Sequence, residues 1–215
     1  MKLSDILVNN VNDLWEEALG KDFVVRMALG TLERERFCNY MLQDYLYLLD
    51  YTDILKSTKE YSRSTELTEF LNKIIEETGN ELYRVHIPNM KELGITEEDI
   101  SEAVMEPVIA EYVGYMREVL YKYGLFAGLT ALLQCSYIYA FIGENISEKY
   151  SDRIADSPYK SWFDAYTCSE YIKTNEMWAD LLDNLSVGLS EEDISNLCSI
   201  FVKCAGYENK FWEIL

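Results

Sequence analysis

Apolar residues recur at three- and four-residue steps along most of the chain, which is the spacing of one face of an α-helix. The first such stretch runs from Leu7 to Ala18 and stops at Gly20. Alternation of apolar and polar residues is nowhere long enough to predict a sheet. The pattern therefore predicts an all-α chain.

Start and stop signals divide the chain into seven to nine helices within one domain over residues 1–215. Capping hydroxyls and prolines suited to a first helical turn mark the starts, and glycines mark the ends. The expected starts are Ser4, Thr31, Ser64 or Thr65, Thr96 with its acidic first turn, Pro107, Ser157-Pro158 and Ser190 with Asp193, and the expected ends include Gly20, Gly30 and Gly124. Because heptads are not sustained, a multi-helix bundle with crossing helices is expected, not a coiled coil.

One long stretch, from Tyr123 to Gly143, carries no formal charge and is long enough to raise the question of a membrane span. It also contains Gln134, Ser136 and several tyrosines. A central helix over about 125–147 that is buried on most sides is the favoured interpretation.

The charge balance is strongly acidic, with 38 Asp and Glu against 19 Lys and Arg, for a net charge of -19. Such a surface repels phosphate backbones and anionic lipid, so nucleic acid and membranes are poor partner candidates. The five cysteines are scattered and form no C-x-x-C pair. They predict reduced thiols in a cytoplasmic protein without a disulfide framework or a metal site.

The single histidine, His86, removes several reaction classes. A di-iron bundle needs Glu-x-x-His on two helices, and a His-ligated haem or a catalytic dyad would have to use this one residue. His86 precedes Ile87-Pro88. We favour a position at a helix C-terminus, where the helix dipole stabilises a cation, over a ligand role.

Three residues could carry chemistry, each with a structural alternative. Asp44 lies in a tyrosine stripe, and it either meets a tyrosine hydroxyl or an amide in the core, awaits a polar ligand or is solvated beside half-exposed tyrosines. Cys135 stands one turn before Tyr139 in the uncharged helix, where a thiol is normally a small core residue. Glu208 stands one turn before Trp212, where it could act as a proton donor with a raised pKa or pair at the surface.

Taken together, these segments resemble the TenA family of thiamin salvage enzymes, also called thiaminase II, over nearly the whole chain. Six motifs occur in order with family-like intervals. They are the turn from Phe23 to Gly30-Thr31-Leu32, Tyr40-x-x-Gln43-Asp44-x-x-Tyr47-Leu48, Glu111-Tyr112-x-x-Tyr115-Met116, Ala131-Leu132-Leu133-x-Cys135-x-x-x-Tyr139, Tyr159-x-x-Trp162-x-x-x-Tyr166 and Tyr207-Glu208-x-x-Phe211-Trp212.

The resemblance implies an all-helical fold of the haem-oxygenase-like type without haem, metal or other cofactor, assembled as a homotetramer. It implies hydrolysis of a small aminopyrimidine, 4-amino-5-aminomethyl-2-methylpyrimidine, to the hydroxymethylpyrimidine and ammonia. Cleavage of thiamin to the same pyrimidine and the thiazole is also implied. Cys135 places the chain with the cysteine-type branch of the family.

By the same resemblance, Cys135 matches the nucleophile that adds to the pyrimidine ring, and Glu208 matches the acid that protonates the ring nitrogen or the leaving group. Asp44 matches the carboxylate that accepts from the 4-amino group. The matching substrate-binding tyrosines are Tyr47, Tyr112, Tyr139 and Tyr166.

Two other function classes stay open at this point. A pyrimidine-binding or regulatory homologue would keep the same pocket without turnover. An oxidative helical-bundle enzyme would handle a quinone or a metal-bound substrate, and the single histidine speaks against it.

Overall fold

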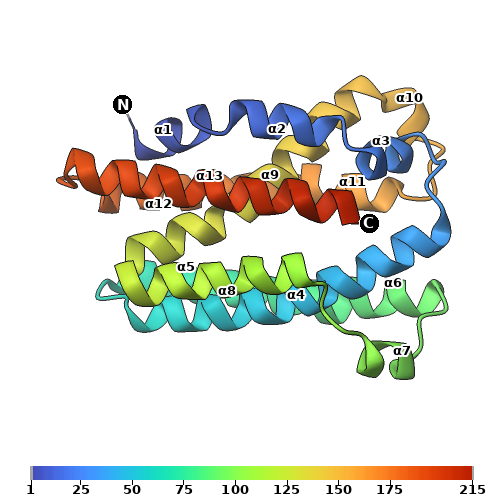
Figure 1. The fold of residues 1–215 in the computed structure, drawn as a ribbon, viewed down its shortest axis with the longest axis horizontal. Helices are drawn as coiled ribbons and strands as arrows, with labels where there is room; N and C mark the ends of the chain where they lie inside the picture. The colour runs from blue at the N-terminus through green and yellow to red at the C-terminus, as the bar shows by residue number, and fades with distance from the viewer. Residues whose placement is uncertain (1, 215) are drawn as a thin grey trace. The chain divides into compact units, whose positions relative to one another are not determined.

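The computed structural model describes residues 2–214, apart from the side chains of Arg84 and Val85. Over this range the chain forms thirteen α-helices and one π-helix, and no strand (Figure 1). The all-α prediction is confirmed. The helices form two compact units, one from residues 2–32 with 129–214 and the other from 33–128, and each is described by itself.

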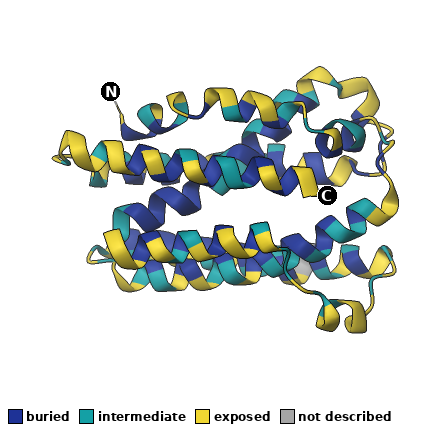
Figure 2. Ribbon diagram, viewed as in Figure 1, coloured by how far each residue is buried: buried dark blue, intermediate teal, exposed yellow. Residues whose placement is uncertain are grey.

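The long helices of both units have buried residues along one side and exposed residues along the other (Figure 2). This is the amphipathic pattern that predicts helices packed on a core. More of the chain is helical than the sequence signals suggested, because several short helices carry few or no buried residues. Helix α7, for example, has none.

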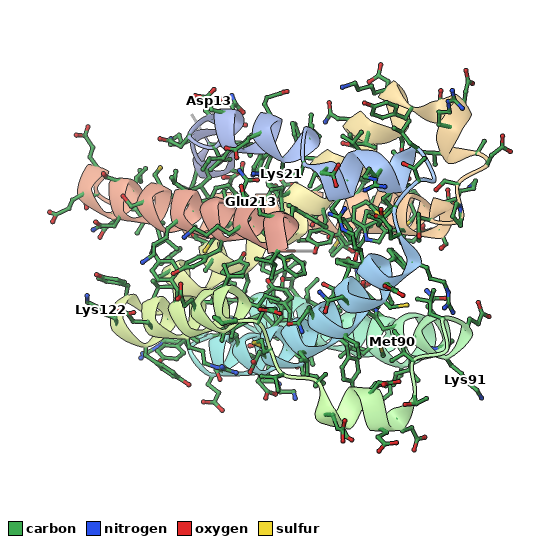
Figure 3. The ribbon with its side chains drawn as sticks, turned by 45° about the vertical axis from the view of Figure 1, so that its right-hand side comes forward. Asp13, Lys21, Met90, Lys91, Lys122 and Glu213 are labelled. Atoms are coloured by element: carbon green, nitrogen blue, oxygen red, sulfur yellow. The ribbon has the colours of Figure 1, made fainter. Side chains whose placement is uncertain are left out.

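In the first unit, α13 packs against α1, α2 and α3, and α12 packs against α1 and α11. Lys21, between α2 and α3, places its Nζ 2.6 Å from Glu17 Oε1 and 2.6 Å from Glu213 Oε1, which ties this turn to the end of α13 (Figure 3). The helices of this unit are α1 (Leu3–Asn9), α2 (Asn12–Leu19), α3 (Asp22–Ala28), α9 (Leu125–Lys149) after its first turn, α10 (Ser151–Ile154), α11 (Lys160–Thr167), α12 (Ser169–Leu185) and α13 (Glu191–Ile214).

In the second unit, α4 packs against both α5 and α8, and the π-helix η1 packs against α4, α5 and α6. Helices α5, η1 and α6 follow one another without an intervening loop. The helices of this unit are α4 (Arg34–Glu60), α5 (Thr65–Glu81), η1 (Leu82–His86), α6 (Ile87–Glu92), α7 (Glu97–Glu102) and α8 (Pro107–Tyr123).

Most of the expected capping signals are confirmed. Ser64 accepts a hydrogen bond from Leu67 N, and Thr96 forms a reciprocal capping box with Asp99. The same reciprocal bonds join Ser190 and Asp193 before α13. Pro107 begins α8, and Gly124 ends it with a φ of 80°, a conformation that favours glycine.

Several helix boundaries differ from the prediction, among them that of α11, which begins at Lys160 and not at Ser157-Pro158. Ser4 is not an N-cap, because its N–H and hydroxyl both donate to Asp183, each at 2.8 Å. Thr31 is not one either, since α4 starts after Glu33. The expected helix over 4–20 is broken where Asn10 Nδ2 donates to the Ile6 carbonyl and so competes with helix continuation.

The uncharged segment forms α9, and its most apolar window is long enough to cross a membrane but is 67% buried inside the protein. A core helix passes the same length and composition test. The position of α9 therefore agrees with the expected central helix. Helix α12, which the sequence signals did not single out, contributes Trp178 and Leu182 to the core.

Candidate functional site

The proposed site residues fall into two groups, one in each compact unit. The second unit holds Asp44 and Tyr47 on α4 and Tyr112 on α8. The first unit holds the remaining four, which are Cys135 and Tyr139 on α9, Tyr166 on α11 and Glu208 on α13.

Asp44 is buried and bound to the single histidine. His86 Nε2 lies 2.6 Å from Asp44 Oδ2, and the two residues are 4% and 3% exposed. Asp44 is thus not solvated, and its protein partner is an imidazole and not the expected tyrosine hydroxyl or amide. A carboxylate so far from water requires such a partner, since an isolated buried charge is very costly.

The helix does not end at His86, so the interpretation that its C-terminal dipole explains this residue is wrong. Helix α5 passes into the π-helix η1, and the chain then continues as α6 with Pro88 in its first turn. The Ile87 N–H donates to the Leu82 carbonyl five residues earlier, which is the π-helical pattern. Such wide turns occur frequently at functional sites.

Opposing influences act on the charge of His86. Burial lowers the pKa of the imidazole, whereas the hydrogen bond and negative charge of Asp44, followed by the charge and backbone carbonyl of Glu81, raise it. The net effect is a pKa above the ordinary value of 6.5. His86 therefore holds a proton more firmly than an exposed histidine.

Three tyrosines of the second unit form an aromatic wall between α4 and α8. Tyr47 stacks on Tyr112 of α8 with centroids 5.6 Å apart, and Tyr51 lies 5.7 Å from Tyr47. All three are buried. The structure thus brings Tyr47 and Tyr112 together, as expected for residues that contact one flat ring.

Gln43, next to Asp44, fixes the segment that leads into α8. Its Nε2 donates to the Val104 carbonyl at 3.0 Å, and its Oε1 accepts from the Glu106 N–H at 2.8 Å. This segment immediately precedes α8, the helix that carries Tyr112. Gln43 therefore helps to hold Tyr112 opposite Tyr47.

In the first unit, Tyr139 is the centre of an aromatic cluster. Its ring centroid lies 4.8 Å from Tyr166, 5.8 Å from Trp162 and 5.5 Å from Trp212. These contacts join α9, α11 and α13 through side chains that are all buried. Tyr139 and Tyr166 are thus brought together, and the cluster gives this part of the unit a continuous aromatic surface.

Cys135 stands one helical turn before Tyr139, and Glu208 stands one turn before Trp212. The rings of Tyr139 and Trp212 contact each other. One turn of α-helix rises about 5.4 Å, so both are close in sequence and space to the same cluster. Cys135 is half-buried, and Glu208 is 2% exposed. Glu208 is therefore a core carboxyl and not a surface residue paired near Lys210.

The second unit supplies the buried carboxyl group of Asp44 beside tyrosines, and the first unit supplies the buried carboxyl group of Glu208, the Cys135 thiol and aromatic side chains. Carboxyl groups accept from amino groups or transfer protons, and tyrosine and tryptophan faces hold flat rings. Among the described residues, no group of three His, Cys, Asp or Glu is arranged to hold a metal ion.

Sequence reasoning missed His86 as the partner of Asp44. It lies 42 residues from Asp44, and the π-helix that positions it has no simple sequence signature. The one available signal was that Asp44 interrupts an apolar and aromatic stripe and would need a partner if buried.

A family model described as the TENA/THI-4/PQQC family matches residues 8–215. Two curated proteins named aminopyrimidine aminohydrolase are similar over the whole chain. The Helicobacter pylori protein is 28% identical, and the match covers 98% of its length. The Halalkalibacterium halodurans protein is 27% identical, and the match covers 95% of its length.

The fold matches solved structures as well. A structure described as a TenA homologue from P. horikoshii OT3 superposes with a TM-score of 0.88 at 27% identity, covering 100% of this chain and 98% of the other. The arrangement of helices is therefore that of TenA homologues.

Proposed function

Because the chain belongs to the TENA/THI-4/PQQC family, we propose that it is an aminopyrimidine hydrolase of thiamin salvage. The family match over residues 8–215, together with relatives named aminopyrimidine aminohydrolase, carries this proposal. The proposed substrate is 4-amino-5-aminomethyl-2-methylpyrimidine, with thiamin as a second substrate.

Substrate binding is assigned to the aromatic and acidic residues of the candidate site. The proposed role of Asp44 is to accept a hydrogen bond from the 4-amino group, which sets the orientation of the ring. Tyr47, Tyr112, Tyr139 and Tyr166 are proposed to line the pocket. Their burial and their packing as two pairs, Tyr47 on Tyr112 and Tyr139 with Tyr166, support these roles, because preformed aromatic walls hold a flat heterocycle without reorganisation.

The proposed chemistry is covalent. Cys135 Sγ adds to an electron-poor ring carbon, and the protons of the Cys135 thiol and of Glu208 pass one to the ring nitrogen and the other to the departing amine. The bond from the exocyclic methylene to nitrogen then breaks and releases ammonia. Water adds to the methylene and gives a proton back to Glu208. The Sγ–carbon bond then breaks as the ring nitrogen gives its proton to Sγ, which restores the thiol and the aromatic ring.

Ammonia release from the aminomethylpyrimidine, run beside thiamin cleavage, tests this proposal. We expect wild type to be active and Cys135→Ser to lose nearly all turnover while it still binds the hydroxymethylpyrimidine product. Cys198→Ser is the matched control, because burial raises the pKa of the Cys198 thiol and leaves it a poor nucleophile. Product binding without ammonia release in wild type would instead favour a pyrimidine-binding homologue.

We further propose a cytoplasmic homotetramer, as the family resemblance implies. Light scattering on the purified chain at micromolar concentration tests the assembly. A mass of one 25.1 kDa chain would contradict it.

A further inference from the structure

The bond between His86 and Asp44 determines how much of the carboxylate is available to a ligand. Nε2 of His86 holds Oδ2 of Asp44 at 2.6 Å, and both side chains are buried. A carboxylate with two available oxygens can accept two parallel bonds from an amidinium-like group. With Oδ2 held by the imidazole, Asp44 presents one oxygen.

We propose that His86 is the positioning residue for Asp44, and that it leaves Oδ1 to accept a single hydrogen bond from the exocyclic amino group of a neutral aminopyrimidine. This inference rests on the proposed function and deepens it. It names the charge state of the ring that the site selects.

The geometry supports this role in two ways. The π-helix interrupts the α-helical hydrogen-bond pattern at His86, the residue that contacts Asp44. Such π-helical turns are frequent at functional sites. The imidazole also supplies the positive charge that a buried carboxylate needs. A neutral ligand then keeps the pair balanced, whereas a protonated ring would add an uncompensated charge.

The charged groups acting on His86 belong to the helices that pack on η1. Asp44 of α4 and Glu81 of α5 both favour the protonated imidazole. On α6, Lys91 and Glu92 are exposed. Burial opposes protonation of His86, and among the charged groups Asp44 favours it most strongly. Binding of a neutral ring should be tightest while the imidazole carries its proton.

The chain offers an unusually direct experiment, because a protein with one histidine gives one imidazole signal in an NMR titration. We expect the pKa of His86 to lie above 6.5 in wild type and to fall in Asp44→Asn. Saturation with the hydroxymethylpyrimidine product should raise it further, by linkage. Asp53→Asn, the same chemical change at an exposed position of α4, is the matched control and should leave it unchanged.

Kinetics separate positioning from a purely structural role. His86→Leu should raise KM for the aminomethylpyrimidine by roughly 10-fold or more and shift binding toward acidic pH, where the ring is protonated. His86→Gln, which can still donate to Oδ2 without a charge, should recover part of the affinity and also serves if the leucine variant does not fold.

A pKa at or below 6.5, or one insensitive to Asp44→Asn, would overturn the inference. So would wild-type KM and pH profile in both His86 variants. Wild type without ammonia release and without product binding would instead overturn the proposed function, even with the pair intact.

Discussion

At the scale of single residues, the two carboxyl groups of the candidate site are buried for different reasons. Asp44 is balanced by His86, whereas Glu208 lies within the aromatic core of the first unit, one turn from Trp212. The imidazole partner leaves Asp44 one oxygen that can accept a hydrogen bond. The acid role proposed for Glu208 is tested by substitution.

Replacing Glu208 by glutamine should lower kcat for ammonia release by roughly 10²–10⁴-fold, the usual contribution of a general acid. The amide keeps the shape of the side chain but has no acidic proton to transfer. Steady-state kinetics with Glu213→Gln as control would show this, since Glu213 is exposed on the same helix. Full activity in Glu208→Gln would rule out the acid assignment.

At the scale of helices, close approach of α9 and α11 depends on Gly143. A Cβ there would lie 3.2 Å from both Tyr166 Cβ and Thr167 Cγ2, tighter than ordinary contact. Gly143 therefore permits the packing that places Tyr166 4.8 Å from Tyr139.

Gly143→Ala should destabilise the protein by about 1–3 kcal/mol, as overpacking does, and raise KM by displacing Tyr166. Gly206→Ala is the matched control, because a Cβ at that helical position meets nothing within 4 Å. It should be neutral or stabilising by about 0.5–1 kcal/mol. Urea unfolding of both variants measures the difference, and equal effects would show that the contact is not limiting.

Gln43 also acts between helices, since it bonds the Val104 carbonyl and the Glu106 N–H in the segment before α8. Gln43→Ala should cost about 1–3 kcal/mol, the loss of two hydrogen bonds that each contribute about 0.5–1.5 kcal/mol, and should speed hydrogen exchange at the Glu106 amide. Gln43→Glu keeps the acceptor for that amide but loses the donor to Val104, so it should protect the amide better than alanine. Equal exchange rates in the two variants would contradict this.

Local signals predicted the helices whose ends are set by local chemistry. Ser64, the Thr96 and Asp99 box, Pro107 and Gly124 act within a few residues of themselves, so their sequence context was sufficient. The prediction that Ser4 is an N-cap was wrong because its hydroxyl donates to Asp183, 179 positions away.

The same distinction explains the candidate site. Asp44 and Tyr47 share a helix face, which spacing reveals, whereas the partnership with His86 depends on a π-helical turn and on the packing of η1 against α4. Stacking of Tyr112 on Tyr47 likewise joins two helices and could not be read from either one. Family resemblance identified these residues without showing what holds them.

At the scale of the whole molecule, the net charge of -19 opposes compactness through self-repulsion. Raising sodium chloride from about 0.01 M to about 0.15 M shortens the screening length from about 30 Å to about 8 Å. The melting temperature should therefore rise, by about 2–4 °C for each kcal/mol of repulsion relieved. Sucrose at equal osmolality controls for solvent effects, and a melting temperature that falls with salt would show that attractive ion pairs dominate.

Overall stability should also depend on pH through the one buried histidine. The pKa of His86 is raised in the folded protein above its ordinary 6.5. Below about pH 6.5 the imidazole is protonated in both the folded and unfolded states, so the pair contributes its full stabilisation. As the pH rises through the folded pKa, the proton is lost from the folded state too, and that contribution disappears.

The free energy of unfolding should therefore be higher for wild type than for His86→Gln. This difference should be largest at acidic to neutral pH and should shrink as the pH rises toward 9. Urea unfolding of both proteins at matched pH values measures it, because the subtraction cancels groups that titrate alike in both. A difference that stays constant or grows with pH would show that the charge on His86 does not stabilise the fold. The Asp44 pair would then act through its hydrogen bond alone, and the neutral glutamine would be an adequate substitute at every pH.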